Sequence, residues 1–270
     1  MAGLARKRGE GKEGREGREE RGEEGREERG SGYFVYGWYN GDVGEIPILA
    51  LVPAWNEGTR IGPILERTQV YLPVLVVDDG SRDDTAAVAE ATGATVVRHP
   101  QNRGKGVALM TGFAWALERE YGAVLTLDAD GQHDPADIPK FLAAYEAGAG
   151  ELIIGRRTFS QMPFPRFFTT RFGTWLLSQA LGAPIYDNQS GFRLYSRRFL
   201  ETLDPTTTGF EWEVEVIIQA VCDGVRIGWV DIRTIYGINK VSYFHPIKDT
   251  AIFLGMVWRA WKRRHAMRST

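Results

Sequence analysis

The chain has 270 residues, of which 43% are hydrophobic and 11% aromatic, enough for one large domain with a real core. Its formal net charge of -2 gives no global field that would attract nucleic acid, so no nucleic-acid partner is expected. The single cysteine, Cys222, excludes an intramolecular disulfide framework and favours a reducing compartment.

The N-terminal stretch, residues 1–32, is a low-complexity tract of Gly, Arg and Glu with almost nothing apolar to bury. We predict that it is a disordered tail, with a mixed-charge nucleic-acid-binding arm as the weaker alternative. Residues 33–39 are rich in aromatic side chains and should pack on the domain that follows.

Short apolar runs then predict five strands, over residues 46–52, 74–77, 95–97, 123–127 and 152–154, of which the first and the fourth are expected to be buried. The segments between them predict helices over residues 61–71, from 83–85 to 91, and from about 106 to 119. Strands that alternate with helices at short spacing indicate an α/β fold: a mainly parallel sheet with helices on both faces. Cys222 falls in an apolar helical pattern and should pack there.

Polar side chains follow four of these strands, at the edge where α/β sheets bind ligands. They are Asn56 and Glu57, Asp78 and Asp79, Asp128 and Asp130, and Arg156 and Arg157. Two acids one residue apart are costly to bury unless a positive partner meets them, and a divalent cation that carries a phosphorylated ligand is the obvious candidate. A solvated acidic turn is the alternative for each pair alone, but four clusters at one edge favour a site.

The glycines around Lys105 do not form a known nucleotide fingerprint. Leu109 stands at the third glycine position of a dinucleotide motif, and Val107 stands where a P-loop requires Ser or Thr. Lys105, at a helix N-terminus, could still help to hold a phosphate, or could be a solvated lysine.

Four motifs, in order and at characteristic spacing, resemble the family 2 glycosyltransferases, in the branch of dolichol-phosphate-mannose synthases and polyprenyl-phosphate glycosyltransferases. They are Val52-Pro53-Ala54-Trp55-Asn56-Glu57, Val77-Asp78-Asp79-Gly80-Ser81, Asn102-Arg103-Gly104-Lys105-Gly106 and Leu127-Asp128-Ala129-Asp130-Gly131-Gln132-His133. The resemblance covers roughly residues 46–250. It implies a GT-A fold, a nucleotide-sugar donor and Mg²⁺ or Mn²⁺.

The same resemblance assigns roles to individual residues. Pro53, Asn56 and Glu57 would line the nucleotide pocket, and Asp79 would hold the base or ribose. Asp128 would contact the nucleotide, and Asp130, with Gln132 nearby, would hold the metal on the diphosphate; all three are candidate metal ligands. The segment 187–193 looks like the Ser-Gly-Phe acceptor-side motif, and a segment around Lys240 and Ser242 looks like one that closes over the donor phosphates.

Cations and acids complete the predicted site. Arg156, Arg193 and Lys240 are candidate phosphate partners, whereas Arg157 and Arg197 are interpreted as surface cations. Residues 209–213 look like the start of the family's acceptor-side helix, where the resemblance implies a catalytic acid. Among Glu211, Glu213 and Glu215 we choose Glu213 for that role, against the alternative of solvated helix acids. A sugar hydroxyl acceptor needs a carboxylate base, but a monophosphate, with a second pKa near ~6, is already ionised at neutral pH.

Two aromatic segments predict contact with a membrane surface. Residues 164–181 and 251–268 suit amphipathic helices with interleaved Arg and Lys, and in the second Phe253, Val257 and Trp261 share one face. Neither is long and apolar enough to span a bilayer. The alternatives are packing on the chain's own domain and a contact between two copies in a homo-oligomer.

The sequence thus predicts a disordered tail (1–32), a GT-A glycosyltransferase domain (33–250) and an amphipathic basic helix (251–270). We expect a metal-dependent, inverting transfer of a hexose from a GDP-mannose or UDP-glucose type donor to polyprenyl or dolichyl phosphate, by a protein peripheral on the cytoplasmic membrane face. The alternatives are a soluble enzyme with a saccharide hydroxyl acceptor, a nucleotide-sugar pyrophosphorylase, which should carry a Gly-rich basic loop after the first strand, and a non-catalytic membrane-surface module.

Overall fold

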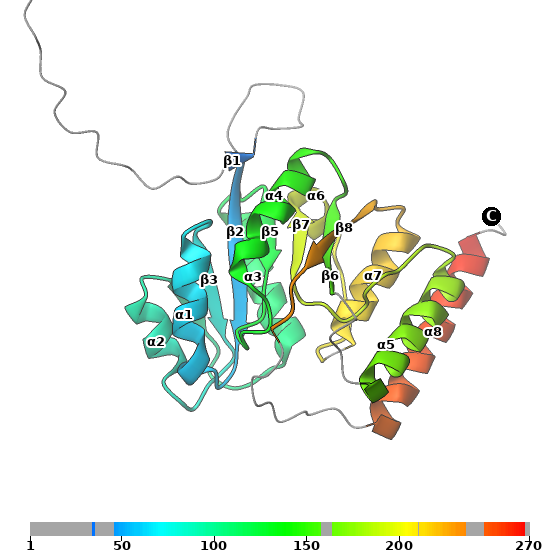
Figure 1. The fold of residues 1–270 in the computed structure, drawn as a ribbon, viewed down its shortest axis with the longest axis horizontal. Coiled ribbons are helices and arrows are strands. Elements are labelled where there is room, and N and C mark those ends of the chain that lie inside the picture. The colour runs from blue at the N-terminus through cyan, green and yellow to red at the C-terminus, as the bar shows by residue number, and fades with distance from the viewer. Residues whose placement is uncertain (1–33, 36–45, 158–163, 210, 236–245, 268–270) are drawn as a thin grey trace, which may run out of the picture. The chain divides into compact units, whose positions relative to one another are not determined.

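The computed structural model describes residues 34–35, 46–157, 164–209, 211–235 and 246–267. In this part of the chain, strands form one sheet in the order β4-β3-β2-β5-β7-β6-β8, and β1 pairs with β2 beside that path (Figure 1). The strands are β1 (Phe34–Val35), β2 (Ile46–Ala54), β3 (Val74–Asp78), β4 (Thr95–Arg98), β5 (Ala123–Thr126), β6 (Leu152–Arg157), β7 (Arg193–Ser196) and β8 (Ile227–Ile232). All five predicted strands are present.

Helices alternate with these strands along the chain. They are α1 (Gly58–Gln69), α2 (Thr85–Ala91), α3 (Lys105–Glu118), η1 (Pro135–Asp137), α4 (Ile138–Glu146), α5 (Phe164–Leu181), α6 (Arg197–Leu200), α7 (Trp212–Cys222) and α8 (Pro246–Met267). The predicted cap of α2 is only partly present: the N-cap residue is Asp84, whose side chain makes no capping hydrogen bond, and Asp83 Oδ1 accepts from the backbone N–H of Thr85 instead.

Two hydrophobic cores lie on the two faces of the sheet, because successive strand residues point to opposite sides. Leu49 and Leu51 of β2 pack in one core with residues of α3, α5, α6, α7 and α8. Ile48 and Ala50, their neighbours in the same strand, pack in the other core with α1, α2 and α4. The predicted α/β architecture with helices on both faces is therefore confirmed, and Cys222 packs against the first core as expected.

The sequence did not reveal β7, which runs antiparallel between β5 and β6. Its residues, Arg193-Leu194-Tyr195-Ser196, are all buried although two of them are polar, so they lack the continuous apolar run that marks the other strands. The direction of β7 matters for the site. Because β7 is antiparallel, its first residues lie at the same sheet edge as the last residues of the parallel strands.

Helices α5 and α8 lie side by side, and α8 also contacts α7 (Figure 1). Their inner sides pack on the first core through Leu177, Ala180, Met256 and Ala260. The predicted stripe on α8 is partly wrong: Phe253 and Val257 are half-buried against the domain. Trp261 is exposed as predicted, and the other large exposed apolar side chains in the described part of α8 are Leu254 and Trp258, because the helix is apolar on two sides and its inner side docks on the domain.

Within the described residues, no helix combines the length and the apolar character that crossing a bilayer requires.

Candidate active site

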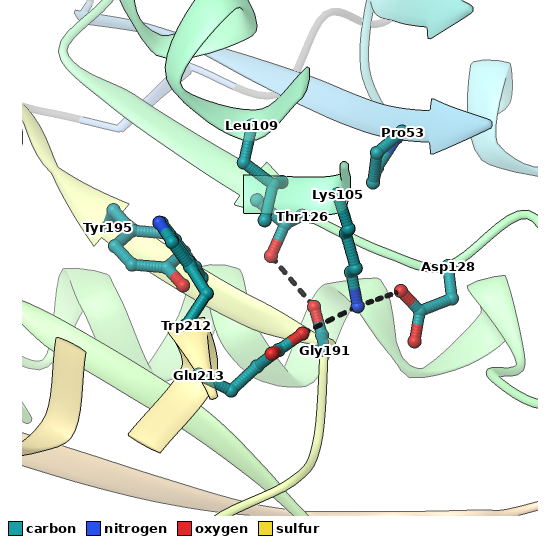
Figure 2. Close-up of a pocket in the computed structure, with 9 residues that line it drawn as sticks. All are labelled: Pro53, Lys105, Leu109, Thr126, Asp128, Gly191, Tyr195, Trp212 and Glu213. Atoms are coloured by element: carbon teal, nitrogen blue, oxygen red, sulfur yellow. Dashed lines mark hydrogen bonds and ion pairs between the residues drawn. The ribbon is translucent and has the colours of Figure 1, made fainter. Parts of the chain in front are cut away.

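A lysine and two carboxylates meet at the carboxyl edge of the sheet (Figure 2). Lys105 begins α3, Asp128 follows β5, and Glu213 lies in the first turn of α7. The Nζ of Lys105 lies 2.6 Å from Asp128 Oδ1 and 2.6 Å from Glu213 Oε1. Pro53, Thr126, Gly191, Tyr195 and Trp212 line the same small pocket. We refer to Lys105, Asp128 and Glu213 as the charge triad.

The charge triad carries a net negative charge in a partly shielded place. Burial by itself lowers the pKa of Lys105, but the Asp128 and Glu213 carboxylates raise it well above its ordinary value. The lysine is therefore a fixed cation at all working pH values. Because one ammonium faces two carboxylates, the triad keeps an excess of one negative charge at the edge of the sheet.

Two glycines let the N-terminus of α3 approach the loop before α7. Gly104 has φ 96°, which disfavours any side chain, and a Cβ there would lie 2.6 Å from the carbonyl oxygen of Thr208. A Cβ on Gly106 would lie 2.6 Å from Trp212 Cδ1, and its N–H donates to Thr208 O at 3.1 Å. The Gly-Lys-Gly motif thus brings Lys105 to Glu213 across 108 positions of sequence, which no local pattern predicts.

Asp79 holds the loop that presents Lys105. Its carboxylate accepts hydrogen bonds from the N–H groups of Arg103 and Gly104, the latter at 2.8 Å. His99 Nδ1 lies 2.6 Å from Asp79 Oδ1, and His99 Nε2 lies 3.0 Å from Thr111 Oγ1. The contact between His99 and Asp79 is buried, and the others are partly buried. The structure therefore gives Asp79 a positioning task; its contact with a base or ribose stays a prediction, and His99, which the sequence left without a role, belongs to the same network.

The Ser190-Gly191-Phe192 motif reaches the site because β7 is antiparallel. Thr126 Oγ1 donates to the carbonyl oxygen of Gly191 at 2.8 Å and ties the motif to β5. A Cβ on Gly191 would lie only 2.6 Å from Asp128 Oδ2. The backbone of Gly191 therefore packs directly on the Asp128 carboxylate, and only glycine fits there without displacing it.

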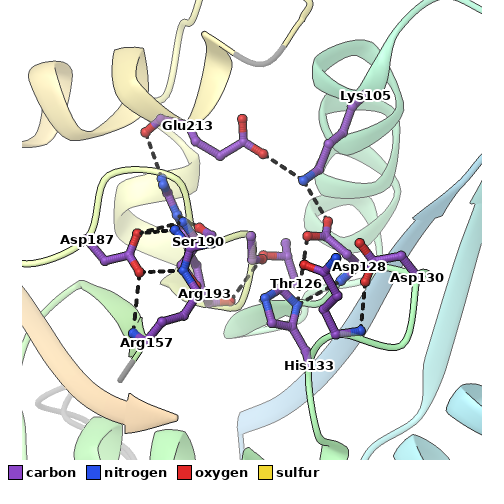
Figure 3. A network of polar contacts seen from close by, with 12 residues as sticks. Lys105, Thr126, Asp128, Asp130, His133, Arg157, Asp187, Ser190, Arg193 and Glu213 are labelled. Carbon is purple, nitrogen blue, oxygen red and sulfur yellow. Dashed lines mark hydrogen bonds and ion pairs between the residues drawn. The ribbon is translucent and has the colours of Figure 1, made fainter. Parts of the chain in front are cut away.

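A buried ion pair shapes the loop before this motif (Figure 3). Asp187 accepts from Arg157 Nε at 2.7 Å and Nη2 at 2.9 Å, and from the N–H groups of Gln189 and Ser190. Burial raises the pKa of Asp187, but Arg157 and these hydrogen bonds lower it by a larger amount. The pKa is therefore below its ordinary value. The interpretation of Arg157 as a surface cation is therefore wrong: it is buried and holds the loop that ends at Gly191.

Asp130 and His133 lie beside Asp128. The N–H of Gln132 donates to Asp130 Oδ1 at 2.8 Å, and the N–H of Asp128 donates to His133 Nδ1 at 3.4 Å. Burial lowers the pKa of His133 more than the neighbouring carboxylates raise it, so the ring is neutral at neutral pH. The Gln132 contact seen here comes from its backbone, and metal binding by its side chain stays a prediction.

The donor set suits a cation that shares its ligands with a substrate. Among the described residues, no three His, Cys, Asp or Glu side chains are arranged to hold a metal by themselves. Asp128 and Asp130 supply hard carboxylate oxygens, and Asp128 already holds a positive group, the Lys105 ammonium. Mg²⁺ and Mn²⁺ sites commonly take one or two carboxylates and complete their shell with phosphates and water, so the residues present fit such a site.

Two arginines predicted to meet phosphate pair with other groups of the protein in this structure. Arg156 pairs with Asp231 through two hydrogen bonds, at 2.6 Å and 2.9 Å, and lies over the Tyr186 ring. Arg193 is fully buried; its Nε donates to Ser190 O and its Nη1 to Glu213 O. Its enclosed guanidinium braces the backbone on both sides of the site, so the structure gives Arg193 a positioning role, and its contact with phosphate stays a prediction.

The remaining predicted residues divide into three groups. Pro53 lines the pocket of the charge triad. Asn56, with φ 54°, accepts from the N–H of Arg82, and Glu57 pairs with Arg60, so both shape the turn after β2. Glu215 accepts hydrogen bonds from Thr206 and Thr207, and Glu211 is the N-cap residue of α7.

Lys240, Ser242 and the tail 1–32 lie outside the described residues. Sequence reasoning missed Tyr195 and Trp212 as pocket residues; Trp212 could have been found from its place beside Glu213, whereas nothing in the sequence marks Tyr195.

Comparisons of the sequence with known proteins identify its family. The family model for Glycosyl transferase family 2 matches residues 50–204. A polyprenol monophosphomannose synthase from Mycolicibacterium smegmatis is 30% identical over 214 residues, 72% of this chain and 80% of the relative. A UDP-N-acetylglucosamine–dolichyl-phosphate N-acetylglucosaminyltransferase from Methanococcus voltae is 30% identical over 218 residues, 70% of this chain and 86% of the relative.

A solved structure shares the fold. Glucosyl-3-phosphoglycerate synthase from Mycobacterium tuberculosis, in complex with Mn²⁺ and UDP-glucose, aligns with a TM-score of 0.63 at 20% identity, over 80% of this chain and 79% of that one. The sheet order and helix layers described above are thus of the GT-A type. The chain belongs to the family 2 glycosyl transferases, and the resemblance identified from its four motifs is confirmed.

Proposed function

We propose that this glycosyltransferase moves a hexose from a nucleotide-diphosphate sugar, of the GDP-mannose or UDP-glucose type, to a polyprenyl or dolichyl phosphate, with inversion at the anomeric carbon. The observation that carries the proposal is the charge triad at the carboxyl edge of the sheet, next to Asp130. Two relatives, a polyprenol monophosphomannose synthase and a dolichyl-phosphate N-acetylglucosaminyltransferase, support the acceptor class.

The residues present match the charges that develop in this reaction. Breaking the bond to the diphosphate places positive charge on the sugar and negative charge on the leaving group. Mg²⁺ or Mn²⁺ bound by Asp128 and Asp130 would supply Lewis-acid stabilisation of that leaving group. Lys105 stays positive and lies beside Asp128, so it adds fixed positive charge at the same place. Gly191 and Thr126 keep the Asp128 carboxylate in position.

The acceptor class decides what Glu213 must do. A lipid monophosphate is mostly ionised at neutral pH, since its second pKa is near ~6, and needs placement rather than a base. Glu213 would then orient Lys105 and the sugar. A second candidate function, transfer to a saccharide hydroxyl, is favoured by one observation: Glu213 Oε2 is buried without a hydrogen-bond partner among the described residues, so it could accept a proton.

Product partitioning tests the acceptor. The enzyme is incubated with Mn²⁺ and radiolabelled GDP-mannose or UDP-glucose, together with either polyprenyl phosphate or free saccharides. We expect label in the organic phase only with the lipid and only before addition of a chelator. Label that stays in the aqueous phase, attached to saccharide, would refute the lipid acceptor.

Substitution of Glu213 separates the two chemistries independently. For a phosphate acceptor, Glu213→Gln should lower kcat by less than about tenfold, whereas a hydroxyl acceptor that needs a base should lose about 10²–10⁴-fold. Glu215→Gln is the matched control, since it removes an acid of the same helix that faces Thr206 and Thr207.

We propose further that helices α5 and α8 bind the surface of an anionic membrane. Phe172, Trp175, Leu254, Trp258 and Trp261 are large apolar side chains on these two helices that are each 47–60% exposed. Lys262 lies over the Trp258 ring at 3.7 Å, and Arg171 and Arg259 are exposed nearby in sequence. Aromatic side chains combined with basic ones are typical of interfacial helices.

Liposome flotation tests this surface. Replacing Trp175 and Trp258 together with Ser should release the protein from vesicles that contain phosphatidylserine, without a change in its melting temperature. Val70→Ser, at an exposed apolar position on α1's C-cap, is the control and should leave binding unchanged. Flotation of the double variant at the wild-type level, or loss of dimer instead of vesicle binding, would favour an oligomer contact. We also propose the cytoplasmic face, which protease protection in intact cells would test.

A further inference from the structure

Lys105 occupies the carboxylate that the proposed metal would use. Its Nζ lies 2.6 Å from Asp128 Oδ1, within hydrogen-bonding distance, and equally close to Glu213 Oε1 (Figure 3). Only 27% of the Lys105 side chain and 6% of the Glu213 side chain are exposed. The ammonium is therefore held by two carboxylates in a place where water screens charges weakly.

A divalent cation on Asp128 would lie within a few ångströms of this ammonium. Two positive groups so close repel each other strongly when screening is weak. The cation also gains less from Asp128 than from an unpaired carboxylate, because Lys105 already neutralises part of that charge. Asp128 can hold both groups well only if further negative charge arrives with the cation, or if Lys105 moves to another acceptor.

The diphosphate of a nucleotide sugar meets both conditions. It carries negative charge to the sheet edge, and its oxygens are acceptors to which a flexible lysine can turn. A lysine ammonium is a compact charge on a flexible side chain, so it can change its acceptor more easily than the planar guanidinium of an arginine. The cation and the diphosphate would then each make the other's binding easier, and this coupling is reciprocal.

We propose that Lys105 makes tight divalent-cation binding depend on the donor diphosphate. In the protein without donor, the ammonium satisfies Asp128 and Glu213 and weakens binding of a free cation; the diphosphate relieves that competition. The inference rests on the proposed function for the location of the cation, and it adds an order of events: the cation enters with the nucleotide rather than before it.

The test measures Mn²⁺ binding without any acceptor lipid. Mn²⁺ is titrated into the wild type and into Lys105→Met, and the unbound Mn²⁺ is followed by electron paramagnetic resonance. The binding of radiolabelled UDP and GDP is measured by equilibrium dialysis with and without MnCl₂. We expect Lys105→Met, without nucleotide, to bind Mn²⁺ at least tenfold more tightly than the wild type. We also expect Mn²⁺ to enhance nucleotide binding less in this variant than in the wild type.

Three further variants control the measurement. Lys105→Arg keeps the positive charge and should bind free Mn²⁺ as weakly as the wild type. Lys140→Met removes a lysine that pairs with Asp137 at 2.8 Å, outside the charge triad, and should also behave as the wild type. If Lys105→Met does not fold because its buried acids lose their partner, the double variant Lys105→Met with Glu213→Gln is compared with Glu213→Gln alone, and the same gain in Mn²⁺ affinity is expected.

The outcomes separate this inference from the proposed function. Equal or weaker binding of free Mn²⁺ by Lys105→Met overturns the role of Lys105. Failure of the wild type to bind Mn²⁺ even with UDP or GDP overturns the inference and also removes the metal from the proposed function. A tenfold gain in Lys105→Met together with no label transfer to lipid leaves the inference standing and overturns only the acceptor assignment.

Discussion

Gly191→Ala is the substitution whose effect the structure defines most directly. A methyl group at this position would lie 2.6 Å from Asp128 Oδ2, 2.8 Å from Oδ1 and 2.9 Å from the carboxylate carbon. Carbon–oxygen contacts are rarely shorter than about 3.3 Å, so the two groups must separate by about 0.7 Å. Neither moves freely, because Lys105 holds Asp128 and Thr126 holds the carbonyl of Gly191.

This displacement should affect activity more than folding. Overpacking of this kind costs about 1–3 kcal/mol of unfolding free energy, which a domain of this size should survive. A shift approaching 1 Å in a group that positions a substrate can cost about 100-fold in rate. We therefore expect kcat to fall by between about tenfold and about 100-fold, with weaker Mn²⁺ binding in the presence of nucleotide.

The assay follows label transfer from donor to acceptor at saturating Mn²⁺, beside a thermal unfolding curve of the same sample. Gly255→Ala is the matched control, because a Cβ at Gly255 would meet nothing within 4 Å. It should keep full activity and gain up to about 1 kcal/mol, since alanine is the better helix former. A Gly191→Ala enzyme with wild-type kcat and Mn²⁺ affinity would refute the close packing of Gly191 on Asp128 as a functional requirement.

Three further predictions concern the residues around the site. Arg157→Met should lower the unfolding free energy by about 3–5 kcal/mol, because it leaves Asp187 buried and unpaired. Arg156→Met should lower it by at most about 1 kcal/mol, because the ion pair of Arg156 with Asp231 is exposed. Urea unfolding measures both losses, and equal losses would refute the claim that only the buried pair matters for stability. The pKa of Asp187 is lowered in the folded state, so its contribution to stability is complete above the unfolded pKa of about 4 and is lost as the pH falls from there towards the lower folded pKa. Between pH 7 and pH 3, the melting temperature should therefore fall less for Asp187→Asn than for the wild type. An equal fall in both proteins would refute the linkage. His99→Ala should raise the KM for the donor several-fold with little change in kcat, because the loop tied to Asp79 loosens. His99→Gln should recover part of the lost donor affinity, because glutamine can still hydrogen-bond to Asp79. Donor titrations measure both, and a KM for His99→Gln as high as that of His99→Ala would argue against hydrogen bonding as the cause.

The parts of the fold that could be predicted depend on local pattern. The strands β2, β3, β5 and β6 are continuous apolar runs, and each ends in polar residues, so both their existence and their shared edge follow from the sequence. The strand β7 could not be found in this way, because Arg193 and Ser196 interrupt its apolar character although both are buried. Some of its buried polar groups bond to distant segments, as Arg193 Nη1 does to the backbone carbonyl of Glu213, and such contacts cannot be read from a local pattern.

The parts of the site that could not be predicted depend on side-chain direction and on long-range contacts. Arg156 and Arg157 are adjacent in one strand, and strand geometry sends them to opposite faces. Only the fold shows that Arg157 meets the buried Asp187 whereas Arg156 meets the exposed Asp231. In the same way, the motif identified Lys105 as a residue at a helix start, but its partner Glu213 depends on how α7 docks.

The antiparallel strand β7 has a consequence for the order in which the chain folds. Strand β5 pairs with β7 through partners such as Leu125 and Leu194, and β6 pairs with the other side of β7 through Ile153 and Leu194. A nascent chain that has not yet produced β7 therefore exposes an open edge on β5 and has no neighbour for β6. Such pairing over long sequence separation slows folding, and open edges invite association between chains. A fragment that ends before β7 should therefore aggregate.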